Sequence, residues 1–188
     1  RTRQFRLANG MQLALLSKQN RGRTVRATLL LNLGDEASLQ GQAEVARLTA
    51  AMLMRGTQRA SREDIAQELD RLRSRLHLSG HAQQVTASIE TVREHLPAVL
   101  VLLQQILREP AFPANEFDQL LRQTQAAIES ARIEPDSVSS LAMARHFNDW
   151  PSDDIRYVKN PDEQLQSLDR VSRDDLRDFH ARFYGTAS

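Results

Sequence analysis

Residues 24–57 read TVRATLLLNLGDEASLQGQAEVARLTAAMLMRGT, and the spacing of apolar residues changes within this stretch. The first part is apolar at every second position, the pattern of a strand with one buried face: Val25, Ala27, Leu29, Leu31 and Leu33. Further on, Val45, Leu48 and Met52 recur at the spacing of a helix that buries one stripe. We expect this helix to close at Gly56, because glycine readily adopts the left-handed conformation found at helix ends. The stretch therefore predicts a strand followed by an amphipathic helix.

Another strand signal precedes this stretch, at residues 3–17. Asn9-Gly10 separates two runs that alternate apolar and polar residues, and Asn-Gly supplies the positive φ angles of a tight turn. The sequence thus predicts a hairpin here, and we expect the hairpin and the strand at 24–33 to form a meander.

Beyond residue 57, helical patterns enclose a second pair of strands. Ser61 is placed to cap a helix with the apolar stripe Ile65, Leu69, Leu72 and Leu76. Leu78-Ser79-Gly80 and the alternation at Val85, Ala87 and Ile89 predict two strands or one bent hairpin. Thr91-Val-Arg-Glu94 has the form of a capping box, so we expect the next helix to open there and to end before Pro110.

Three more helices are expected in the last third of the chain, at residues 115–132, 137–147 and 172–183. Val171 is placed to pack against Leu176 as a staple of the last one. The stretch 150–161 is rich in Pro and Asp and is interpreted as a long surface loop.

These elements predict an α+β fold, in which helices cover one face of a mostly antiparallel sheet. With 188 residues, of which 40% are hydrophobic, the chain is long enough for one sizeable core, and we interpret residues 1–188 as a single domain. The chain begins at Arg1 without an initiator Met or an apolar leader, so we expect it to come from a larger precursor.

The composition excludes several functions. There are 25 basic and 24 acidic residues and no Lys/Arg cluster with interleaved aromatics, so nucleic acid is not expected as a partner. No apolar stretch is long enough to predict a membrane span. The absence of cysteine excludes thiolate catalysis and sulfur-ligated metals. It leaves the compartment open, a periplasmic or otherwise exported location included.

The five histidines are the first candidates for chemistry: His77, His81, His95, His146 and His180. His77 and His81 have the spacing of two zinc ligands on one helical face. Ser79-Gly80 between them favours extended structure instead, where residues four apart are separated by roughly 13 Å. Two imidazoles at that distance cannot share one ion, so no metal site is predicted. We interpret the other three as ordinary packed or surface histidines.

The remaining candidates also have structural explanations. Asp153-Asp154, Asp174-Asp175 and the pair Glu129 and Glu134 are typical of solvated loops and helix ends, where acidic residues favour the helix dipole. The glycines stand apart and form neither a dinucleotide-binding nor a P-loop pattern. No constellation of residues supports a function as an unrelated enzyme built on these histidines or aspartates.

The order of motifs resembles the pitrilysin/insulinase/mitochondrial-processing-peptidase family of zinc metallopeptidases. The similar segments are Phe5-x-Leu-x-Asn-Gly-Met-x-Leu, Gly34-Asp35-Glu36, Met52-Leu-Met-Arg-Gly-Thr57, Pro110-Ala-Phe-Pro113, Pro161-Asp-Glu, and the stretch from Val171 to Gly185. Together they extend over essentially the whole chain. The resemblance implies a metallopeptidase half-domain, which normally continues with a further strand beyond Tyr184-Gly185. We therefore expect the chain to be truncated before its last strand.

The resemblance also implies that the catalytic residues are missing. Active members carry H-x-x-E-H on the helix before the Met-Leu-x-x-Gly-Thr segment, where two His bind zinc and the Glu activates water. In this chain the first ligand's place falls on Arg47, the general base's on Ala50 and the second ligand's on Ala51. The third ligand's place lies near Ile128 and Glu129. No catalytic, cofactor or metal site is therefore expected here. We expect Leu48 to face the core, and changes at Thr49 or Ala50 to matter much less.

Two functions follow from the resemblance. In the first, this chain is the degenerate half of a zinc endopeptidase whose other half binds the zinc, and it forms chamber wall and inter-domain packing surface around a peptide substrate. In the second, the whole parent protein is an inactive homologue that serves as a scaffold. The expected partners are the remainder of the parent, its peptide substrate, and a second copy of the chain through an unpaired sheet edge.

Overall fold

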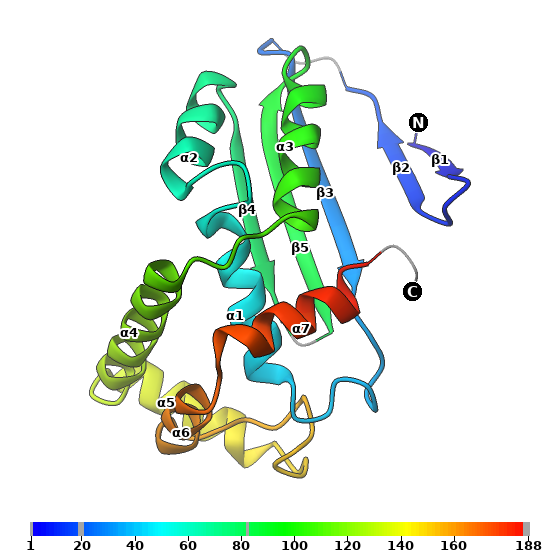
Figure 1. Cartoon of the computed structure of the whole chain (residues 1–188). Coiled ribbons are helices and arrows are strands. Elements are labelled where there is room, and N and C mark those ends of the chain that lie inside the picture. Colours follow the sequence, from blue (N-terminus) through cyan, green and yellow to red (C-terminus); the bar gives the residue numbers. More distant parts are fainter. Residues whose placement is uncertain (1, 19–20, 82, 186–188) are drawn as a thin grey trace.

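The protein is described by a computed structural model that covers residues 2–18, 21–81 and 83–185 (Figure 1). The chain opens with an antiparallel hairpin of β1 (Thr2–Arg6) and β2 (Gln12–Leu16). Gly10 has a φ of 85°, and the side chain of Asn9 accepts a hydrogen bond from the backbone N–H of Met11 at 3.2 Å. The hairpin predicted from Asn9-Gly10 is thus confirmed.

The second sheet has three antiparallel strands in the order β3 (Thr24–Asn32), β5 (Gln84–Val92) and β4 (Arg75–Gly80). The predicted pair of strands after residue 74 is confirmed, but the expected meander is wrong. The strand β3 pairs with β5, and the hairpin forms its own two-stranded sheet. A period of two determines which face of a strand is buried and not which strand lies beside it.

Two helices connect β3 to β4. The first, α1 (Ala43–Met52), continues into a short 3-10 turn at Leu53–Arg55. Gly56 ends it as expected and has a positive φ of 133°, which favours glycine, but its ψ of 147° lies outside the left-handed helical conformation. The second, α2 (Arg62–Arg71), begins with the predicted cap: Ser61 and Asp64 form a reciprocal capping box.

The helix α2 is shorter than its apolar stripe predicted. It ends at Arg71, and Arg73 turns the chain with a φ of 47°, so Leu76 belongs to β4. Leu72 is still buried at the helix end. Leu72 and Leu76 are four residues apart, which fits both a helix and a strand, and the turn at Arg73 places them in different elements.

The next helix, α3 (Leu96–Arg108), begins later than predicted. Thr91 lies within β5, where its buried hydroxyl is 2.6 Å from that of Ser74, so the expected capping box is wrong. His95 occupies the cap position without a side-chain hydrogen bond, and Pro97 lies in the first turn. Thr91 can be buried within the strand because its hydroxyl has a hydrogen-bond partner inside the protein.

Four helices complete the chain: α4 (Ala114–Ala131), α5 (Pro135–His146), α6 (Pro161–Asp169) and α7 (Arg173–Phe183). Three were predicted, and α6 was not; a capping box between Asn160 and Glu163 begins it. Ser172 caps α7, and Val171 packs against the cluster that contains Leu176, so the predicted staple is confirmed. The expected loop at 150–161 ends where α6 begins.

The helices cover one face of the three-stranded sheet, as expected for the α+β class (Figure 1). The helix α3 contacts β5, and α1 and α2 contact β4. Alternate residues of β5 are buried: Val85, Ala87, Ile89 and Thr91. On the opposite face Leu30 of β3 is 57% exposed. A second apolar cluster joins α1 to α4, α6 and α7 and includes Leu48, Met52, Phe117, Leu120 and Leu176. The helix α1 thus lies between the two apolar clusters of the molecule.

Candidate functional site

The helix α1 is fixed by packing on two sides. Ala46 and Ala50 belong to the cluster against the sheet, and Leu48 and Met52 to the cluster with α4, α6 and α7. Leu48 is fully buried, so its expected position in the core is confirmed. Thr49 is also fully buried, and its hydroxyl donates a hydrogen bond to the carbonyl of Val45 at 2.7 Å.

The expectation that Thr49 and Ala50 tolerate change is contradicted by their burial. Ala50 is only 2% exposed and touches the end of β4. A Cβ atom at residue 80 would lie 2.2 Å from the Cβ of Ala50, so glycine is required there for α1 and β4 to approach this closely. Because Ala50 is buried in this close contact, a longer side chain at residue 50 would crowd the strand.

The other two positions singled out on this helix have different environments. The guanidinium of Arg47 is partly exposed and forms an ion pair with Glu44, one turn earlier on the same helix. Ala51 is partly buried against the second apolar cluster. Arg47, Ala50 and Ala51 therefore do not face one common space.

A cavity of about 530 Å³ lies beside Arg47, and we call it the Arg47 cavity. It is bounded by α1, the end of β4, α4, the loop before α6 and α6 itself, and its lining includes Glu44, Arg47, His81, Ile128, Tyr157 and Lys159. Glu129 is not among the lining residues and instead forms an ion pair with Arg132 at 3.3 Å. Glu129, near the expected place of the third ligand, thus belongs to the surface of α4.

The histidines lie where the sequence placed them, with one addition. His77 is exposed within β4 and His81 follows the strand, so the extended structure between them is confirmed. The sequence did not indicate that His81 lines the Arg47 cavity, because that requires the end of β4 to meet α1. Among residues 2–18, 21–81 and 83–185, no group of three or more His, Asp or Glu side chains is arranged to hold a metal ion.

His180 is a packed residue of α7. Its Nε2 lies 2.8 Å from the carbonyl oxygen of Leu107, and its ring stacks on Tyr184 with centroids 4.8 Å apart. Burial lowers the pKa of His180 below its ordinary value, which favours the neutral imidazole. This histidine has a partner and a structural role, as its place on an apolar face indicated.

The acidic pairs also serve the structure. Asp154 accepts two hydrogen bonds from the side chain of Arg156, at 2.8 and 2.7 Å, and one from its backbone N–H at 2.8 Å, and these bonds lower the pKa of Asp154 to about 2. The guanidinium of Arg156 lies 3.3 Å from the ring centroid of Trp150, which fixes the loop before α6. Asp175 accepts from the backbone and hydroxyl of Ser172 at the start of α7, and these bonds lower its pKa.

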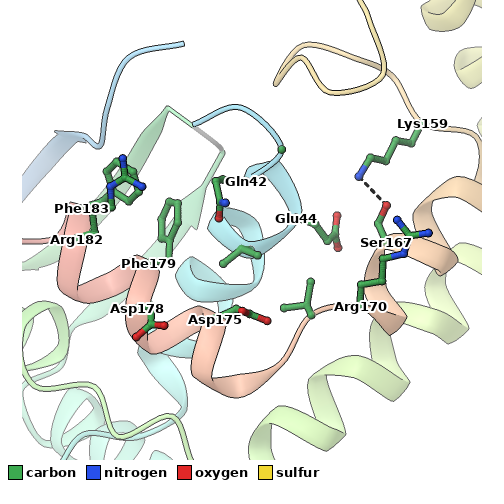
Figure 2. Close-up of a pocket in the computed structure, with 13 residues that line it drawn as sticks. Gln42, Glu44, Lys159, Ser167, Arg170, Asp175, Asp178, Phe179, Arg182 and Phe183 are labelled. Carbon is green, nitrogen blue, oxygen red and sulfur yellow. Dashed lines mark hydrogen bonds between the residues drawn. The ribbon is translucent and has the colours of Figure 1, made fainter. Parts of the chain in front are cut away.

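Figure 2 shows a second cavity, of about 480 Å³, which shares lining residues with the first. It lies between the start of α1, α6 and α7, and we call it the α7 cavity. Glu44 and Lys159 line both cavities, so these two side chains mark the junction. No helix of the described residues is long and apolar enough to cross a membrane.

The fold is shared with solved structures. An inactive domain of peptidase M16 from Pseudomonas fluorescens superposes with a TM-score of 0.80 at 20% identity over 96% of this chain and 43% of the other. A protease from Helicobacter pylori gives 0.77 at 13% identity over 99% and 44%. Pitrilysin gives 0.72 at 18% identity over 99% and 20%. The chain thus spans less than half the length of each of these three structures.

Sequence comparison gives the family itself. No curated protein sequence matches the chain. The sequence profile of the family described as Insulinase (Peptidase family M16) matches residues 14–152, which is well over half of the chain and includes α1 and most of the sheet. The chain therefore belongs to the insulinase family, peptidase family M16.

Proposed function

We propose that this chain is a non-catalytic half-domain of an M16 zinc metallopeptidase and that it forms chamber wall and packing surface for a catalytic half. The observation that carries this proposal is the composition and packing of α1. Active members have H-x-x-E-H where this chain has Arg47, Ala50 and Ala51, and Ala50 is packed so closely against Gly80 that a longer side chain would crowd the strand. The likeness to an inactive M16 domain supports the same conclusion.

The residues at these positions do not fit zinc. A catalytic zinc site uses three protein ligands, supplied by His, Asp, Glu or Cys, and leaves one position open. A guanidinium and two methyl groups offer no such ligand, and Ile128 faces the Arg47 cavity from α4 in place of a carboxylate. Under this proposal the zinc belongs to the catalytic half of the parent protein, and this chain takes no part in activating water.

The surface of the chain supports a packing role. Ile133, Met143 and Phe147, on and beside α5, are 83%, 67% and 77% exposed, and no residue of α5 is buried. Apolar side chains this exposed favour contact with another domain. The outer edge of β3 has no strand partner among the described residues, so the remainder of the parent, or a second copy, has an edge to pair with.

The proposal is tested by reconstitution. The chain would be combined with a partner that contains H-x-x-E-H, and cleavage of a fluorogenic peptide would be measured with each part alone and with both together. We expect zinc-dependent cleavage that requires both parts and disappears when the partner's general base is changed to Gln. Unchanged cleavage by the partner alone would contradict the chamber role. If no partner with H-x-x-E-H exists in the parent, the scaffold function replaces this proposal.

A further inference from the structure

Lys159 lines both the Arg47 cavity and the α7 cavity and thus lies at their junction. Figure 2 shows it among the residues of the α7 cavity. It is one of only two lysines in a chain that contains 23 arginines, and the other, Lys18, is exposed and follows β2. Its side chain extends from the loop before α6 toward Ser167. A flexible ammonium group is therefore placed between two spaces large enough to admit a ligand.

The ammonium group of Lys159 has unused hydrogen-bonding capacity. Its Nζ donates to the hydroxyl of Ser167 at 2.7 Å, and that hydroxyl donates in turn to the carbonyl of Glu163, also at 2.7 Å. No carboxylate of the described residues forms an ion pair with Lys159. An ammonium group has three donors, and a partly buried cation is stabilised by an anion that accepts them.

On the side of the α7 cavity where Lys159 lies, a second cation, Arg170, is close to it (Figure 2). Arg170 follows Ser167 by one turn at the end of α6, lines the α7 cavity, and makes no ion pair within the part of the chain that the structure describes. Glu44 is the carboxylate at the junction, and its charge is offset by its ion pair with Arg47. Asp175 and Asp178 line the same cavity from α7, on its far side in Figure 2.

The backbone that carries Lys159 is held in place before any ligand arrives. The carbonyl of Lys159 accepts from the side chain of Gln164 at 2.9 Å. The preceding residue, Val158, donates to Asn148 at 3.1 Å and accepts from Arg145 at 2.7 Å. Binding an anion therefore does not require this part of the backbone to become ordered, and the entropy cost is limited to the side chain of Lys159.

We propose that Lys159, Ser167 and Arg170 form a carboxylate-binding site at the junction of the two cavities, and that its ligand is a carboxylate of a peptide. Lys159 and Arg170 supply the charge, and Ser167 orients the ammonium group. The size of the two adjoining cavities, about 480 and 530 Å³, leaves room for the residues on either side of the bound carboxylate. Only the identification of the ligand as a peptide rests on the proposed chamber function; the anion site itself does not.

The two lysines make a direct test possible. Protein labelled with carbon-13 at the lysine ε-carbon gives one signal for Lys18 and one for Lys159, assigned with Lys18→Met and Lys159→Met. The labelled chain would be titrated at constant ionic strength with three short peptides whose N-termini are blocked. One has a free C-terminal carboxylate and no charged side chain, one is amidated and contains one Glu, and one is amidated and carries no charge. The first two separate a terminal carboxylate from a side-chain carboxylate, and the third is the control.

We expect a saturable shift of the Lys159 signal with at least one carboxylate-bearing peptide, and no shift of either lysine with the neutral amidated peptide. Binding followed by the fluorescence of a labelled peptide should weaken about tenfold or more in Lys159→Met, the size expected for a hydrogen bond to a charged group, and remain unchanged in Lys18→Met. Arg170→Met should also weaken it. A Lys159 signal that does not move, or that moves together with Lys18, would overturn the site. Because the chain is titrated alone, this result is independent of the reconstitution assay.

Discussion

The two flanks of α1 differ in the room that their neighbours leave. The packed flank has two sides: Ala50 touches β4 so closely that residue 80 must be glycine, and Leu48 is fully buried in the cluster with α4, α6 and α7. On the other flank Glu44 and Arg47 face a cavity of about 530 Å³. The helix that carries the metal ligands in active relatives therefore contributes to folding on one side here and remains open to a ligand on the other.

The largest expected effect comes from restoring a carboxylate on the packed flank. Ala50→Glu should destabilise the chain by roughly 5 kcal/mol or more, because burying a charge costs several kcal/mol and the larger side chain also overpacks the contact with Gly80. Chemical denaturation would measure the loss. Ala43→Glu, the same substitution on the open flank in the first turn, serves as control and should change stability by less than about 0.5 kcal/mol. Equal effects of the two variants would show that the flanks do not differ.

Removing volume from the packed flank should have the next largest effect. Leu48→Ala should cost about 2–5 kcal/mol of stability, because Leu48 is a fully buried residue of the cluster that joins α1 to α4, α6 and α7. Leu100→Ala is the matched change on α3, where the leucine is 45% exposed, and should cost much less. Urea titrations of both variants would check this. A loss below about 1 kcal/mol for Leu48→Ala would indicate that α1 is not a packing helix.

A smaller, pH-dependent effect is expected from His180. Burial places its pKa in the folded state below the ordinary 6.5, so the unfolded chain binds more protons as the pH falls through that value. The contribution of this residue to stability should therefore be lost as the pH decreases from about 7 toward 5. In His180→Gln this part of the pH dependence should disappear. Parallel stability profiles of the two proteins over this range would contradict the assignment.

The smallest effect is expected on the open flank. Arg47→His removes a partly exposed ion pair with Glu44, and pairs at this spacing contribute about 0.2–0.5 kcal/mol. Thermal melts should barely distinguish this variant from the original chain. A large loss of stability would mean that Arg47 supports the fold and that the cavity beside it is not free to accept a ligand.

Local features of the fold could be predicted from the sequence because their causes are local. Asn9-Gly10 determines a hairpin turn, and Ser61 and Ser172 determine helix starts, through hydrogen bonds within a few residues. Gly56 was recognised as a helix end for the right reason, its tolerance of positive φ, although its ψ differs from the left-handed conformation. These signals act over less than two turns of helix.

Features that depend on distant contacts could not be predicted. The partner of β3 is β5, more than 50 residues away, and the alternation of β3 fits any neighbouring strand. Thr91 has the form of a helix cap, but its hydroxyl meets Ser74 inside the protein. Lys159 was part of an expected surface loop, and its place between two cavities follows only when the loop packs against α1 and α6. Side chains from separate segments form these sites, so no single stretch of sequence shows them.

The central claim, that α1 no longer forms a metal centre, is tested most directly by the zinc content of the purified chain. After dialysis against metal-free buffer without chelator, and after a second dialysis in the presence of a slight excess of zinc, elemental analysis should find far less than one zinc per chain. We expect the same low zinc content in His77→Ala and His81→Ala. Near-stoichiometric zinc in the original chain that disappears in either variant would contradict it and would place a metal site at the end of β4.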